Sequence, residues 1–113
     1  MKPNRQTHWA VRNINGTSDN TCVCRSWLAH WKLGANRSGR VLCAVHGCSQ
    51  PAEVGAHVQI TDGRSSWQWW IAPFCKKHNH KSNTEEMFLK AAVCLISANV
   101  QTTCQRGDWW EDL

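Results

Sequence analysis

Two short stretches contain the residues that decide the fold of this chain, Val41-Leu42-Cys43-Ala44-Val45-His46-Gly47-Cys48 and Phe74-Cys75-Lys76-Lys77-His78. In the first, a glycine before the second cysteine lets the backbone curl so that its amides can face the sulfurs. In the second, a cysteine and a histidine lie at i and i+3, on one face of a predicted short helix over residues 74–81. These spacings are typical of structural zinc sites with four sulfur or nitrogen ligands. The sequence therefore predicts one structural Zn²⁺ ion, bound by Cys43, Cys48, Cys75 and His78.

The segment between the two pairs predicts a β-hairpin that brings them together. Apolar and small residues at 54, 56, 58 and 60 alternate with Gly55, His57 and Gln59, which is the period of a strand. Asp62-Gly63 is a strong hairpin signal, and residues 67–71 predict the return strand, which Pro73 would end.

The flanking segments predict further elements around this core. Residues 9–14 predict a short strand, and Ser26 predicts the N-cap of a short helix that carries Trp27 and Trp31 one turn apart. Residues 84–92 could form a helix and 93–100 a strand, and of these alternatives we favour two strands that cover the core. We expect a single α+β domain over residues 1–113, with a zinc core at about 41–82 and the flanking segments packed on it.

Seven cysteines in 113 residues require an explanation. Their odd number, their close spacing and the lack of a recognisable export signal favour metal ligands over disulfides. A second metal site is a further interpretation, with the ligands Cys22, Cys24, His30 and Cys104. Cys94 lies in an apolar run and is expected in the core. The longest apolar run is far shorter than the ~20 residues of a membrane span, so we expect a cytoplasmic protein without membrane contacts.

The formal net charge is +5, and it is unevenly distributed. Lys76, Lys77 and Lys81 form a cluster that we expect to contact the phosphates of a nucleic acid. The chain also has eight tryptophans and no tyrosine, and most of them are expected in the core. Trp109 and Trp110 near the C-terminus are candidate anchors for a protein partner, which is the alternative to nucleic acid.

Residues 42–81 resemble the zinc-bearing HNH endonucleases, the ββα-metal members of the treble-clef group. The resemblance is carried by Cys43 and Cys48, by Gly55-Ala56-His57-Val58, and by the segment from Ile71 to Lys81. It implies a treble-clef core with additional strands, with His57 as the general base that activates water. It also implies Asn79 as a ligand of a catalytic Mg²⁺ or Mn²⁺ ion. The layout of the whole chain is similar to that of a group of small uncharacterised bacterial proteins, which brings no activity with it.

Two positions depart from the HNH pattern. Ala56 stands where that family usually has an acidic metal ligand, and Trp70 stands at about the place of the asparagine that orients the catalytic histidine. A hard cation such as Mg²⁺ needs carboxylate or other oxygen ligands. The sequence therefore leaves two interpretations: a metal-dependent DNA endonuclease, or a catalytically inactive zinc-stabilised module that binds nucleic acid or a protein.

Overall fold

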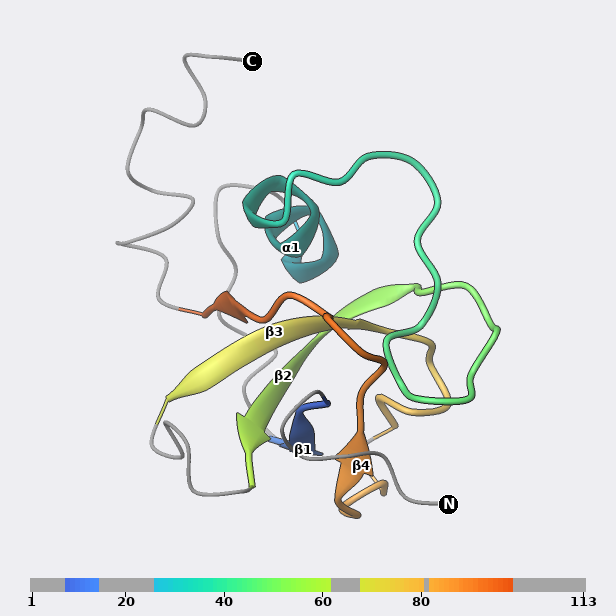
Figure 1. Ribbon diagram of the computed structural model, residues 1–113, viewed down its shortest axis with the longest axis vertical. Helices are drawn as coiled ribbons and strands as arrows, with labels where there is room; N and C mark the ends of the chain where they lie inside the picture. Colours follow the sequence, from blue (N-terminus) through green and yellow to red (C-terminus); the bar gives the residue numbers. More distant parts are fainter. Residues whose placement is uncertain (1–7, 15–25, 62–67, 81, 99–113) are drawn as a thin grey trace.

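Two long strands, β2 (Val54–Ile60) and β3 (Trp69–Phe74), form the centre of the sheet in the computed structural model (Figure 1). The structure describes residues 8–14, 26–61, 68–80 and 82–98. The two strands pair antiparallel from Val54 opposite Phe74 to Gln59 opposite Trp69. This register follows from the period-2 pattern of β2, because a shift by one residue would exchange its buried and exposed side chains.

Three shorter strands extend this pair into a five-stranded antiparallel sheet with the order β4-β1-β2-β3-β5. They are β1 (Ala10–Asn13), β4 (Met87–Phe88) and β5 (Ile96–Ser97). Segments from both ends of the described chain therefore flank the central hairpin. β1 lies beside β2, and β5 lies beside β3.

The sheet separates two apolar clusters, one on each face. Ala56, Val58 and Ile60 of β2 belong to the larger cluster, which also contains Cys43 and Cys75. The intervening residues of β2 face the other way, toward the helix. There Trp27 and Trp31 pack with Ile71 in a smaller cluster.

The helix α1 (Trp27–Gly34) covers this second face and contacts β2 and β3 (Figure 1). Ser26 is its N-cap, and the side chain of this serine accepts a hydrogen bond of 3.0 Å from the Ala29 N–H. At the C-terminal end, Asn36 has a positive φ of 56°. The Arg37 N–H donates to the Lys32 carbonyl at 2.8 Å, and the Asn36 N–H donates to the Leu33 carbonyl at 3.3 Å. These two bonds form a Schellman motif, which satisfies the last carbonyls and turns the chain sharply.

Several expectations from the sequence are confirmed. The chain forms a small α+β domain in which the strand near residues 9–14, the helix capped by Ser26 and the strand from Val54 are present. The preference for two strands in the tail is confirmed by β4 and β5, although each has two residues. The hairpin signal Asp62-Gly63 lies outside the described residues.

The predicted end of the return strand at Pro73 is wrong, because β3 continues to Phe74. The Pro73 carbonyl accepts a hydrogen bond of 2.8 Å from the Ala44 N–H. In a strand, the N–H and C=O of one residue point to the same side. The N–H that proline lacks would thus point toward the loop that contains Ala44 and not toward β2. The pairing of β3 with β2 therefore loses no hydrogen bond.

The predicted helix over residues 74–81 is also wrong. The structure has a single turn there, closed by a hydrogen bond of 3.1 Å from the Asn79 N–H to the Cys75 carbonyl. The Ser82 N–H donates to Nδ1 of His80 at 3.1 Å instead of continuing a helical ladder. Asparagines at 79 and 83 also have low helix propensity. The helix that a ββα-metal core would have after the hairpin is therefore replaced by a turn.

Candidate metal centre

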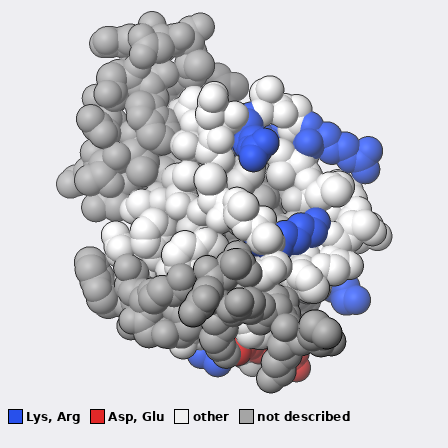
Figure 2. All heavy atoms as spheres, in the orientation of Figure 1, with Lys and Arg blue, Asp and Glu red and all other residues white. Residues whose placement is uncertain are grey.

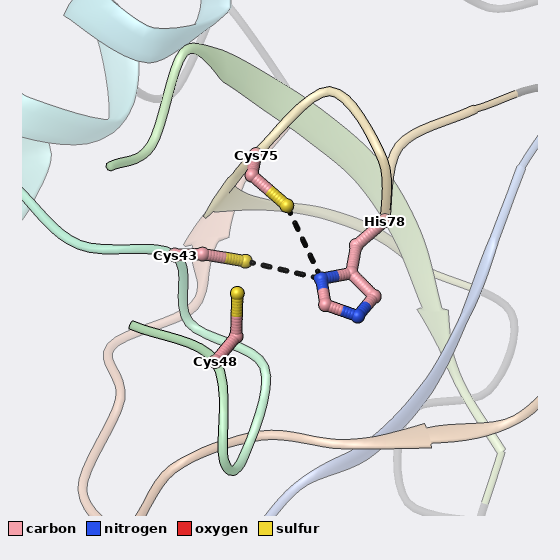
Figure 3. A group of neighbouring side chains, drawn as sticks. All are labelled: Cys43, Cys48, Cys75 and His78. Atoms are coloured by element: carbon pink, nitrogen blue, oxygen red, sulfur yellow. Dashed lines mark hydrogen bonds between the residues drawn. The ribbon is translucent and has the colours of Figure 1, made fainter. Parts of the chain in front are cut away.

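Four side chains that could hold a metal ion such as zinc converge at the surface of the larger cluster: Cys43, Cys48, Cys75 and His78 (Figure 3). Their four ligand atoms all lie within 4.8 Å of one another. Cys43 and Cys48 come from the loop before β2, whereas Cys75 and His78 come from the turn after β3. Because β2 and β3 are paired, the start of one strand lies beside the end of the other. The hairpin thereby brings together ligands that are about 30 residues apart in sequence.

The distances in this cluster match a tetrahedral zinc site. Nδ1 of His78 lies 3.2 Å from Sγ of Cys75 and 3.6 Å from Sγ of Cys43. With Zn–S bonds of ~2.3 Å and Zn–N bonds of ~2.0 Å, a tetrahedron separates sulfur and nitrogen ligands by about 3.5 Å. Three sulfurs and one nitrogen also form the Cys3His donor set typical of structural sites. Cys43 and Cys75 are buried, as in a closed site without an open position for substrate.

Backbone groups of the first loop stabilise the thiolate forms that a metal requires. Burial raises the pKa of Cys43 to about 11, although hydrogen bonds from the Val45 and Cys75 backbone act to lower it. Burial also acts to raise the pKa of Cys48, but a backbone hydrogen bond from Gln50 and the neighbouring thiols outweigh it, so this pKa is lowered. Each cysteine of the loop is thus bonded to the backbone two residues on. This is the curled geometry that Gly47, with a φ of 84°, makes accessible.

Asn13 of β1 holds the second ligand turn in place. Its side-chain Nδ2 donates to the carbonyl of His78 at 2.7 Å and to the carbonyl of Asn83 at 3.3 Å. Asn83 in turn donates from its own Nδ2 to the His78 carbonyl at 2.9 Å. The metal turn is therefore tied to the first strand. Contacts of this kind, to the backbone of a ligand, fix the orientation of the ligand side chain.

Positive charges surround the candidate site. Lys76 and Lys77 are exposed between the two ligands of the turn. The pKa of His78 is lowered, first by burial and then by the positive charge of Lys77. Lys90 acts on the other side, where its charge helps to lower the pKa of Cys48. Three thiolates and one Zn²⁺ ion would carry a net charge of −1, so these lysines also balance the site. Lys81 of the predicted cluster lies outside the described residues.

His57 lies on the opposite face of the sheet from the four ligands. Its ring is 7% exposed and packs against Trp27, with ring centroids 4.5 Å apart. Burial, followed by the nearby charge of His30, lowers the pKa of His57 to about 4. Asn79 lies in the metal turn, half-buried. The HNH resemblance joins His57 and Asn79 in one catalytic site. In this structure their surroundings differ: His57 packs against Trp27, whereas Asn79 lies in the turn that carries Cys75 and His78.

Of the predicted second metal site, only His30 lies in the described part of the chain; Cys22, Cys24 and Cys104 are outside it. His30 is fully buried in α1, and its Nε2 lies 2.8 Å from the Ser97 carbonyl. Burial lowers the pKa of His30, which the hydrogen bond to Ser97 partly offsets. Nδ1 of His30 is buried without a hydrogen-bond partner among the described residues. The expectation that Cys94 is a core residue is wrong, because its side chain is exposed.

Asn13 and Lys90 are neighbours of the site that were not recognised from the sequence. Both lie far from the ligands along the chain, and they approach the ligands through pairing of β1 with β2 and through a bond from the Lys90 N–H to the Ala44 carbonyl. For Asn13, the one available signal in the sequence was its position at the end of the predicted strand.

Comparisons with known proteins add no relative, since no family model, no curated protein and no solved structure matches the chain. Within the described residues, no helix is both long and apolar enough to cross a membrane. The Cys3His cluster is therefore the feature on which a functional interpretation depends.

Proposed function

We propose that the protein is a nucleic-acid-binding domain whose Cys3His zinc site, HNH-like in its ligand spacing but without the treble-clef helix, is structural and not catalytic. The observation that carries this proposal is the pair of exposed lysines, Lys76 and Lys77, inside the turn that supplies two of the four metal ligands. A bound metal fixes that turn, and with it the backbone positions from which both lysine side chains extend. Lysines held in this way would contact phosphates of a nucleic acid without reading its sequence.

The charge of the visible surface supports a phosphate-rich partner. Figure 2 shows basic side chains spread over the upper and right-hand part of one face, including the loop that follows α1, and acidic side chains near its lower edge, where a further basic side chain lies beside them. A surface of one sign attracts an oppositely charged polymer and speeds its association. A bacterial or phage protein partner is the alternative, and it would not require this charge.

The test is binding of a labelled DNA duplex over a range of salt concentrations. We expect affinity to fall linearly with salt on a double-logarithmic plot, because bound lysines release counterions. Lys76→Gln and Lys77→Gln should each weaken binding and reduce the slope by about 1. Lys32→Gln on α1, which removes the same charge from the opposite face of the sheet, should leave the slope nearly unchanged. Binding that does not depend on salt would refute the proposal.

The second candidate function is a DNA endonuclease with His57 as general base and Asn79 as a ligand of Mg²⁺ or Mn²⁺. The HNH resemblance of residues 42–81 motivates it, but burial lowers the pKa of His57 to about 4, which makes its imidazole a weak base at pH 7. The Trp27 ring over His57 argues for binding instead, because substrate would have to displace α1. Plasmid cleavage with either metal ion, lost in His57→Ala, would establish the endonuclease.

A further inference from the structure

A cavity of about 370 Å³ lies beside the metal loop and contains no candidate metal ligand other than Cys43 in its wall. Four segments form it: the end of α1 with the loop that follows, the start of the metal loop (residues 43–48) with the two residues before it, Pro73 of β3, and residues 90–94. Its volume is within the ~300–1,000 Å³ of small-molecule sites. Neither Lys76 nor Lys77 lines it, so it is separate from the surface proposed above to contact nucleic acid.

Three cations line this cavity, Arg37, Arg40 and Lys90, and no acidic side chain of the described residues does. Both arginines are exposed and lie on the loop after α1, and Lys90 lines the cavity from a different segment of the chain. Arginine presents a planar array of donors that matches the oxygens of a phosphate. Three cations in one cavity are suited to bind an anion.

The remaining wall is apolar. Trp31 and Pro73 line it but are buried, whereas Val41 is half-buried and Leu42 has an exposed fraction of 48%. Among the described residues, Leu42 is one of two large apolar side chains with such exposure. An anion alone would leave Val41 and Leu42 uncovered. A ligand with a phosphate and a flat, weakly polar ring would cover both the cations and the apolar side chains of the cavity.

The backbone around the cavity is held in a defined shape. The Schellman motif at the end of α1 fixes the start of the Arg37–Arg40 loop. Nε1 of Trp31 donates to the Cys94 carbonyl at 2.8 Å, and the Lys90 N–H donates to the Ala44 carbonyl at 2.8 Å. Between these bonds Ala92 has a φ of 62°, a conformation that L residues rarely adopt. Unusual backbone of this kind is concentrated at binding sites, where neighbouring contacts maintain it.

We infer that this cavity binds a nucleotide phosphate, with Arg37, Arg40 and Lys90 around the phosphate and the base against Val41 and Leu42. The same chemistry has two sources, a free mononucleotide or the phosphorylated end of a nucleic acid strand. The second source rests on the proposed function, and it would place a strand end beside the loop that carries Cys43.

Cys94 provides a direct reporter, since it is exposed and lines the cavity. The zinc-loaded protein is treated with iodoacetamide, and the alkylation rate of Cys94 is followed by peptide mass spectrometry. The probes are inorganic phosphate, uridine monophosphate, and one short single strand with and without a 5′-phosphate. We expect uridine monophosphate or the phosphorylated strand to slow alkylation at least about fivefold, and inorganic phosphate to have a smaller effect. The double variant Arg37→Gln/Arg40→Gln should lose the protection, and Arg12→Gln should keep it.

The outcomes separate this inference from the proposed function. Protection by uridine monophosphate without any binding of strands would support the cavity and refute the nucleic-acid proposal. A strand that binds about tenfold more tightly with its phosphate, and protects Cys94, would support both. Strands that bind equally with and without the phosphate, while every probe leaves Cys94 alkylation unchanged, would overturn the cavity inference and leave the nucleic-acid proposal standing. Protection that persists in the double variant would also overturn it.

Discussion

The rings of Trp27 and His57 pack edge to face, with centroids 4.5 Å apart and an interplanar angle of 75°. Trp27 also contacts His30 edge to face, with centroids 5.0 Å apart and an interplanar angle of 67°. One tryptophan of α1 therefore contacts two buried histidines, one from its own helix and one from the sheet. This arrangement joins the helix to the face of the sheet that does not hold the metal cluster.

The burial of His57 predicts a dependence of stability on pH. Its pKa is about 4 in the folded protein and 6.5 in the unfolded chain. Above pH 6.5 the imidazole is neutral in both states and has no effect. As pH falls from 6.5 to 4, the unfolded state takes up a proton that the folded state does not, so the free energy of unfolding falls by up to about 3 kcal/mol. Urea titrations at several pH values measure this loss.

His57→Gln is the matched control for that experiment. The metal ligands also titrate at acid pH, but they do so in both proteins and cancel in the difference. The variant should therefore lose less stability than the parent between pH 6.5 and 4. Parallel curves for the two proteins would show that His57 is not the group responsible.

The contact between α1 and β2 predicts a severe effect of Gly55→Ala. A Cβ at Gly55 would lie 2.3 Å from the carbonyl carbon of Trp27 and 2.5 Å from the backbone nitrogen of Leu28. These are backbone atoms of the helix and cannot rotate away, so the free energy of unfolding should fall by about 3 kcal/mol. Gly39→Ala is the comparison, since its Cβ would meet nothing within 4 Å and only its φ of 73° is unfavourable. It should cost about 1 kcal/mol, and equal losses would contradict the close packing of α1.

The metal cluster predicts that Cys75→Ser lowers the zinc content by one ion per chain relative to the parent protein. Serine is a poor zinc ligand, and the remaining three groups would not form a closed tetrahedral site. Elemental analysis of freshly purified, reduced protein gives the metal content, and thermal unfolding with and without a chelator gives the stability. Cys94→Ser removes an exposed thiol outside the cluster and should leave both unchanged. Full zinc content in Cys75→Ser would exclude this site.

The hydrogen bonds from Asn13 to the metal turn predict that Asn13→Ala weakens zinc binding about 10–100-fold, the range for partners that orient metal ligands. Competition with a chromophoric chelator measures the change. Arg12→Ala, on the same strand but exposed, loses one hydrogen bond to the Thr84 carbonyl and should keep the parent affinity. An Asn13→Ala protein with unchanged affinity would mean that the ligands alone define the site.

The ligand set could be recognised in the sequence because zinc requires particular donors at short local spacings. Cys43 and Cys48 form one local pair and Cys75 and His78 form the other, and the alternation of β2 shows that a hairpin joins them. Each of these signals spans fewer than ten residues. They can therefore be recognised without knowing how the rest of the chain folds.

The helix expected after the hairpin could not be excluded in this way. Local propensity over residues 74–81 does not show that Asn13 and Asn83 bind the His78 carbonyl, which holds the segment as a turn. The packing neighbours of His57 could not be predicted from the sequence either. Alternation predicts that it faces away from Ala56 and Val58, but only the docking of α1 decides that Trp27 covers it.

The sequence by itself thus determined the four candidate ligands, the central strand and the capped helix, because spacing, period and capping are local properties of the chain. The tertiary structure alone decided which face of the sheet α1 covers, which residues support the metal turn, and that Arg37, Arg40 and Lys90 share one cavity. Most of those relationships join residues that are 30 or more positions apart, as Trp27 and His57 or Arg37 and Lys90 are. They arise from strand pairing and burial in three dimensions, for which the order of residues along the chain carries no local signal.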